Sequence, residues 1–128
     1  MDVETATATP LTHVACRITA RDLEWVQDKP AEFGGTNQGP MASELLLSSL
    51  LACQLSTYAK IAAKRKVTAT ANIDGALHLE DGDITKIHLT WKFSEPLEEK
   101  TAQTLMRLTD KVCTISRALS CPVTFEQA

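Results

Sequence analysis

Cysteine is the residue type in this 128-residue chain whose placement allows redox chemistry. Of the four cysteines, Cys53 lies inside the most apolar stretch and Cys113 lies on the apolar side of a later segment. A cysteine thiolate attacks a peroxide oxygen and becomes a sulfenic acid, and a second thiol then closes a disulfide that prevents over-oxidation. The first cysteine needs a lowered pKa, and therefore donors or a cation beside it. The other interpretation of each cysteine is an inert small core residue.

The neighbours of Cys53 follow from helical spacing. Residues three and four positions away share its face, and here these are Ser49, Leu50, Ser56 and Thr57. The hydroxyls can hydrogen-bond a sulfur, and the leucine supplies an apolar wall. Cys53 lies too far along its helix to gain from the N-terminal dipole, which acts within the first turn. We therefore expect side chains to activate this thiol.

The other candidate ligands and nucleophiles carry weaker signals. Cys16 alternates with apolar residues and is expected in the core, while Cys121 precedes the final strand and is interpreted as incidental. No Cys-x-x-Cys occurs, and the three histidines (His13, His78 and His88) lack ligand spacing. The sequence thus predicts neither a metal site nor a bound cofactor.

Charge and hydropathy exclude other classes of protein. The formal net charge is −3 and no basic stripe is present, so nucleic acid is not an expected partner. Polar residues interrupt the longest apolar stretch, and no signal-peptide pattern opens the chain. We expect a soluble cytoplasmic protein without membrane contact.

Periodicity predicts the elements that must position the two cysteines. Residues 1–10 are expected to be flexible, and Asp81-Gly82-Asp83 is expected to form a hairpin turn. Helices are expected over 43–64, with Ser43 as N-cap, and over 97–119. The expected strands are 13–19, 23–27, 67–79, 87–93 and 123–126.

The helix that carries Cys53 has apolar residues on every side. Leu45, Leu46 and Leu47 leave its first turns without a solvated face, so we expect the helix to be buried all round. One chain of this length has difficulty covering both sides. A sheet protects one side, and a second copy of the chain is the simplest cover for the other, which predicts a homodimer.

Several motifs lie in an order that is typical of one family. Asp28-Lys29-Pro30, Gly34-Gly35 and Gly39-Pro40 lead into Glu44–Leu47 and then Ala52-Cys53. Downstream, the stretch 112–119 and the closing strand 123–125 continue the pattern. Together they resemble the OsmC/Ohr family of thiol-dependent hydroperoxide reductases, over nearly the whole chain after residue 12.

The resemblance implies a fold and an activity. The fold is α+β, a single OsmC-like domain over residues 1–128 that forms an intertwined dimer, with an antiparallel or mixed sheet and a long buried central helix. The implied activity is reduction of organic hydroperoxides in oxidative-stress defence, without cofactor or metal. The reductant is a dithiol, either a lipoyl protein or a small thiol. Cys53 takes the peroxidatic role and Cys113 the resolving role. The Cys121-Pro122-Val123 string also matches the family, but only seven residues follow Cys121, so Cys113 is preferred.

Two further catalytic positions match the family less directly. Arg21 best fits the activating arginine, and Arg17 is the alternative. The family's glutamate lies ten residues before the first cysteine, where this chain has Ser43; Glu44 lies nine residues before it. One position turns a helical side chain by about 100°, so Glu44 is either a catalytic partner or a helix cap. The alternative function is a non-catalytic small-molecule or acyl-chain binding protein on the same dimeric fold.

Overall fold

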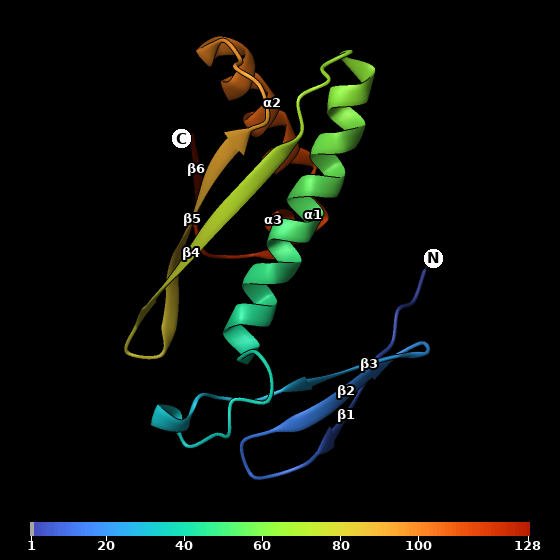
Figure 1. The fold of residues 1–128 in the computed structure, drawn as a ribbon, viewed down its shortest axis with the longest axis vertical. Coiled ribbons are helices and arrows are strands. Elements are labelled where there is room, and N and C mark those ends of the chain that lie inside the picture. The colour runs from blue at the N-terminus through green and yellow to red at the C-terminus, as the bar shows by residue number, and fades with distance from the viewer. Residues whose placement is uncertain (1) are drawn as a thin grey trace. The chain divides into compact units, whose positions relative to one another are not determined.

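The computed structural model describes residues 2–128 as a mixed α+β chain with two small sheets (Figure 1). It divides into two compact units, an N-terminal unit up to Leu45 and a C-terminal unit over Leu46–Ala128. The elements in chain order are β1 (Thr7–Pro10), β2 (Cys16–Ala20), β3 (Leu23–Gln27), the 3₁₀ turn η1 (Ala31–Phe33), α1 (Ala42–Lys64), β4 (Ala71–Glu80), β5 (Asp83–Phe93), α2 (Glu99–Val112), α3 (Thr114–Ala118) and β6 (Val123–Gln127).

The N-terminal unit is an antiparallel sheet of order β1-β2-β3. Strand β3 has the predicted bounds, whereas β2 begins at Cys16, later than expected. The prediction that residues 1–10 are flexible is wrong for Thr7–Pro10, because this segment pairs with β2 from Thr7↔Thr19 to Pro10↔Cys16. Every residue of β2 is half-buried, so the expected alternation of buried and exposed residues is absent.

A buried carboxylate organises the loop before α1. Asp28 is 1% exposed, and its side chain accepts hydrogen bonds from the backbone N–H groups of Lys29, Thr36 and Gln38 and from the Thr36 hydroxyl. These bonds satisfy donors that the irregular backbone leaves without a ladder partner. The Gly-rich loop is therefore fixed by one side chain.

Helix α1 begins one residue earlier than predicted, so the proposed N-cap is wrong. Met41 holds the cap position and Ser43 lies inside the helix. The carboxylate of Glu44 accepts the backbone N–H of Met41 at 2.8 Å, which is half of a capping box.

Helix α1 is buried along one stripe rather than on every side. Its buried residues follow a four-residue spacing: Leu50, Gln54, Tyr58 and Ala62. Leu55, by contrast, is 37% exposed. By length and composition α1 is apolar enough to cross a membrane. Its buried stripe joins a core cluster with β5 and α2, which is the position of a core helix in a soluble fold.

The C-terminal unit holds a mixed sheet of order β4-β5-β6. Strands β4 and β5 are antiparallel across the predicted turn, where Asp81 and Gly82 have positive φ angles of 51° and 85°. Strand β6 runs parallel to β5, which requires the crossover that α2 and α3 supply. The predicted inward face of β5 is confirmed, since its central residues are fully buried: Ile87, Leu89 and Trp91.

Helix α1 packs closely on β4. A Cβ atom at Gly75 would lie 2.8 Å from Cδ1 of Leu47 and 3.1 Å from Cδ2 of Leu51. The predicted inward face of β4 holds for Ile73 and Leu77 but fails at Leu79, which is 57% exposed. The pairing shifts between His78 and Leu79, and this irregularity turns the strand end outward.

The single helix predicted over 97–119 is broken at Cys113. This residue has a non-helical ψ of 117°, with α2 ending before it and α3 beginning after it. The sulfur of Cys113 accepts the backbone N–H of Ser116 at 3.5 Å and so caps the start of α3. Side-chain bonds that stabilise a new helix start compete with continuation of the old one.

Candidate active site

Two cysteines meet inside the C-terminal unit. Cys53 lies midway along α1 and is half-buried, whereas Cys113 lies in the break between α2 and α3 and is fully buried. Each thiol shifts the pKa of the other, so the two side chains lie within interaction range. The structure therefore brings together the two thiols that were predicted to work as a pair.

The surroundings of Cys53 favour its thiolate. Burial, the largest single effect, raises the pKa of this thiol, but hydrogen-bond donors outweigh it and place the pKa below the ordinary value of 9.0. The donors are, in order, the thiol of Cys113, the backbone N–H of Ile115, the hydroxyl of Thr57 and the backbone N–H of Thr114. The sulfur of Cys53 and the hydroxyl of Thr57 are 4.0 Å apart.

Cys113 is shifted in the opposite direction. Burial raises its pKa most, and the hydrogen bond and charge of Cys53 raise it further, while the backbone N–H groups of Ser116 and Ile115 act against them. The net pKa lies above the ordinary value. The interaction between the two thiols thus favours the thiolate at Cys53 and the protonated thiol at Cys113.

The expectation that only side chains activate Cys53 is wrong. Backbone N–H groups of Thr114 and Ile115, at the start of α3, contribute to the lowered pKa. Of the four neighbours on the helix face, Thr57 contacts the sulfur as expected. Ser49 and Ser56 instead donate to the carbonyl groups of Leu46 and Cys53. The prediction of one unbroken helix from 97 to 119 has no helix start at Thr114. It therefore gives no reason to expect the N–H groups of Thr114 and Ile115 to be free to donate to a sulfur.

A carboxylate that sequence reasoning missed joins the elements around the thiols. Asp110 Oδ1 accepts the Gln54 side-chain amide at 3.2 Å and the Ser116 hydroxyl at 2.6 Å. Gln54 follows Cys53 in α1 and is 1% exposed. A buried glutamine inside an apolar helix is the sequence signal that pointed here, since a buried amide requires a partner.

Arg21 and Glu44 belong to the N-terminal unit. Arg21 is exposed in the turn between β2 and β3, where its φ is 54°. Arg17, the alternative, has its Nε 3.2 Å from a carboxylate oxygen of Glu24. Glu44 caps the start of α1, as one of its two interpretations required. Its catalytic role, and that of Arg21, stay predictions.

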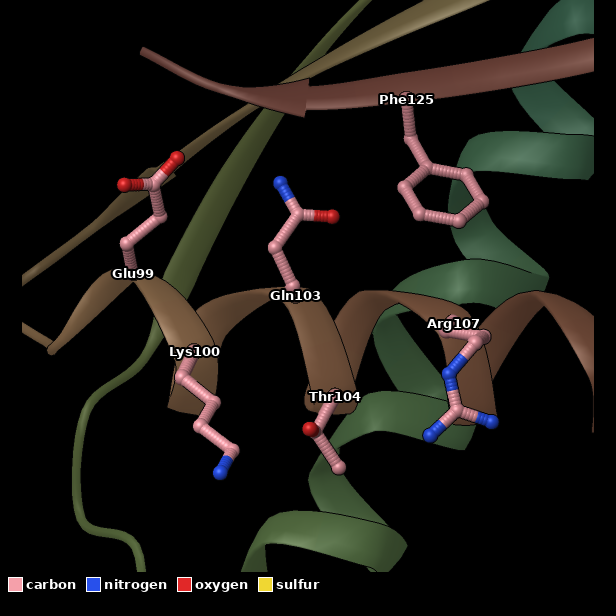
Figure 2. A pocket seen from close by; sticks show the side chains of 6 residues that line it. All are labelled: Glu99, Lys100, Gln103, Thr104, Arg107 and Phe125. Carbon is pink, nitrogen blue, oxygen red and sulfur yellow. The ribbon is translucent and has the colours of Figure 1, made fainter.

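Cys16, Cys121 and the hollow between α2 and β6 are not part of the thiol pair. Cys16 donates to the side-chain oxygen of Gln27 at 3.5 Å, and Cys121 is half-buried. Among residues 2–128 no group of three or more His, Cys, Asp or Glu side chains is placed to hold a metal ion. An open hollow of about 750 Å³ between α2 and β6 holds no cysteine (Figure 2). Its lining residues are Glu99, Lys100, Gln103, Thr104, Arg107 and Phe125.

A family model for OsmC-like proteins matches residues 35–127, a range that includes both Cys53 and Cys113. The chain belongs to the OsmC-like protein family. Its predicted family and its α+β fold class are confirmed, whereas the intertwined dimer stays a prediction. No curated protein matches the chain by sequence.

Solved structures of OsmC-like proteins share the fold. The OsmC-like protein from Mycoplasma pneumoniae has a TM-score of 0.80 at 18% identity, covering 99% of this chain and 96% of its own. The organic hydroperoxide resistance protein OhrB of Bacillus subtilis has a TM-score of 0.78 at 22% identity, covering 99% and 98%. An organic hydroperoxide resistance protein from Legionella pneumophila reaches 0.74 at 18% identity, covering 99% and 96%. At these identities the likeness is one of fold.

Proposed function

We propose that this OsmC-like protein is a thiol-dependent peroxidase that reduces organic hydroperoxides. The observation that carries the proposal is the pair of Cys53 and Cys113, which interact inside the C-terminal unit and whose pKa values are shifted in opposite directions. One thiol is thus prepared as a nucleophile, and the other keeps its proton until it is needed. The organic hydroperoxide resistance proteins that share the fold support the same substrate class.

The proposed reaction consumes one hydroperoxide and two thiols. The Cys53 thiolate attacks the distal peroxide oxygen, so that an S–O bond forms while the O–O bond breaks. The alkoxide takes up a proton and leaves as the alcohol, and Cys53 becomes a sulfenic acid. The thiol of Cys113 then attacks the sulfenic sulfur, which forms the disulfide and releases water. A dithiol reductant, a lipoyl protein or a small thiol, returns both cysteines to thiols by disulfide exchange.

Arg21 is the proposed cation that stabilises the Cys53 thiolate during attack. Arg17 already lies beside Glu24, so its charge is partly neutralised within the N-terminal unit. No ion pair of Arg21 is found among residues 2–128. Glu44 is proposed as the second polar partner, in addition to its capping bond. If Arg17→Ala rather than Arg21→Ala raises the pKa of Cys53, the assignment moves to Arg17.

The active form is proposed to be a homodimer in the cytoplasm. An apolar hollow of about 370 Å³ runs beside α1, lined in part by Leu55, Tyr58, Ala59 and Ala62. Burial of such a surface is favourable, at about 25 cal/mol for each Å² removed from water. A second copy of the chain is the proposed cover for this side of the helix.

Activity measurements with a dithiol reductant test the function. We expect the protein to consume cumene hydroperoxide faster than hydrogen peroxide, because Leu46 and Leu50 give the approach to Cys53 an apolar wall. Cys53→Ser abolishes turnover, since a hydroxyl is not a redox nucleophile. Cys16→Ser is the matched control, because it removes another half-buried free thiol and leaves turnover intact. Wild-type protein that leaves alkyl hydroperoxides untouched would contradict the proposal and favour the binding-protein alternative.

A further inference from the structure

One carboxylate oxygen connects the three helices around the thiol pair. Oδ1 of Asp110, on α2, accepts the side-chain amide of Gln54 on α1 and the hydroxyl of Ser116 on α3. Gln54 is the residue after Cys53, and the backbone N–H of Ser116 donates to the sulfur of Cys113. The same oxygen is therefore bonded to the residue next to Cys53 and is linked to Cys113 by two hydrogen bonds through Ser116.

Helix α3 depends on hydrogen bonds to neighbouring elements for its orientation. It has five residues, Thr114–Ala118, and a helix of this length is not stable by itself in water. The chain at Cys113 is not helical, so α2 does not dictate the direction of α3. The hydrogen bond between Ser116 and Asp110, at 2.6 Å, joins α3 to α2 directly.

We propose that Asp110 is a positioning residue of the thiol centre, whose carboxylate holds the start of α3 so that the backbone N–H groups of Thr114 and Ile115 face the sulfur of Cys53. Asp110 acts through Ser116 and Gln54 rather than on the reacting atoms. The inference rests on the proposed function for its catalytic meaning, and its effect on the thiol is measurable without any hydroperoxide.

The direction of the pKa shift of Cys53 distinguishes an effect of the Asp110 charge from an effect of its positioning. A carboxylate near a thiol disfavours the thiolate, so loss of that charge by itself lowers the pKa of the thiol. Loss of positioning has the opposite effect, because the N–H donors leave the Cys53 sulfur and its pKa rises. The two roles of Asp110 thus predict shifts in opposite directions for the same substitution.

The experiment is alkylation of Cys53 by iodoacetamide, read at each cysteine by mass spectrometry as a function of pH. Asp110→Ala is expected to raise the pKa of Cys53 by about one unit, and to slow its alkylation about tenfold at a pH below that pKa. Asp110→Asn keeps an acceptor oxygen for Gln54 and Ser116 and loses only the charge, so it is expected to bring the pKa of Cys53 back to the wild-type value or below it.

Two further variants keep the result decisive. Ser116→Ala removes only the bond to α3, leaves the bond between Gln54 and Asp110 in place, and is expected to raise the pKa of Cys53 less than Asp110→Ala does. This variant gives the answer if Asp110→Ala fails to fold. Asp74→Ala is the matched control, since it removes one exposed carboxylate from β4 and is expected to leave Cys53 unchanged.

An unchanged or lowered pKa of Cys53 in both Asp110→Ala and Ser116→Ala overturns the inference. Failure of the proposed function looks different. In that case the pKa shifts occur as expected, while the wild-type protein consumes no hydroperoxide.

Discussion

At the scale of single residues, the thiol centre relies on neutral donors. Each group that lowers the pKa of Cys53 is a hydrogen-bond donor: the thiol of Cys113, the hydroxyl of Thr57 and two backbone N–H groups. Such donors stabilise a thiolate where burial opposes charge, and the proposed cation Arg21 would add to their effect during attack. Cys113 is the donor with the largest effect, so it has two proposed roles: first as hydrogen-bond donor to the thiolate, then as resolving thiol.

Substitution of Cys113 separates these two roles. Cys113→Ala removes the donor, and we expect the pKa of Cys53 to rise by about one unit. Cys113→Ser keeps a hydroxyl donor and is expected to leave that pKa closer to the wild-type value. In both variants no disulfide forms, so one equivalent of hydroperoxide gives the sulfenic acid and an excess gives the sulfinic acid at Cys53. Mass spectrometry of the Cys53 peptide measures both the alkylation profile and the oxidation state.

A disulfide between Cys53 and Cys121 in the wild-type protein after mild oxidation would contradict the assignment of Cys113 as the resolving thiol. Cys16 serves as the internal control, because its sulfur contacts Gln27 in the N-terminal sheet and is expected to stay reduced.

At the scale of elements, the loop before α1 depends on one ionised side chain. The backbone N–H of Gln38 contributes most to the lowered pKa of Asp28, followed by the N–H of Lys29. Burial opposes them, and the hydroxyl and N–H of Thr36 add to the lowering. The pKa of Asp28 is lower in the folded than in the unfolded chain. The ionised carboxylate therefore stabilises the fold at pH values above its ordinary pKa of 3.8. That stabilisation is lost as the pH falls through the folded-state pKa.

Asp28→Asn is therefore expected to be less stable than the wild type at neutral pH. An amide has one acceptor oxygen, whereas the carboxylate accepts at both oxygens, from Lys29 at Oδ1 and from Thr36 and Gln38 at Oδ2. The difference in melting temperature is expected to shrink as the pH falls below 3.8 and the wild-type carboxyl becomes protonated. Thermal unfolding followed by circular dichroism at neutral and acidic pH measures it. A difference that is constant with pH would contradict the role of the charge.

At the scale of the whole molecule, helix α1 has apolar residues outside its buried stripe that are not fully buried. Only the stripe of Leu50, Gln54, Tyr58 and Ala62 is buried, although the helix is apolar on further sides. The homodimer predicted from the sequence would cover the rest. An obligate interface of this kind buries at least about 2,000 Å².

The oligomeric state tests this prediction directly. Light scattering of the wild-type protein is expected to give twice the mass of the chain at micromolar concentration. Leu55→Asp places a charge beside the hollow along α1 and is expected to shift the equilibrium toward the monomer. Leu79→Asp, which charges an exposed leucine on β4, is the matched control and is expected to stay dimeric. A well-folded wild-type monomer would contradict the dimer.

Local pattern determined the elements of this protein. Period-two alternation located β4 and β5, turn residues located Asp81 and Gly82, and the Leu-rich run located α1 to within one residue at its start. These features depend on residues close in sequence, whose spacing repeats with the period of a helix or strand. The pairing of Cys53 with Cys113 was predicted through the family's motifs.

Tertiary structure decided how the thiol centre is built. Gln54 and Asp110 are 56 positions apart, and the N–H groups of Thr114 and Ile115 reach a sulfur on another helix. The break at Cys113 follows from its cap with Ser116 and from the bond of Ser116 to Asp110, while the helical periodicity of the sequence continues through it. Hydrogen bonds across such separations form only once the chain has packed, so no local pattern of residues records them. The sequence therefore determined which thiols are present and that Cys53 lies on α1, while packing decided that Cys113 lies in a helix break and which donors surround the two thiols.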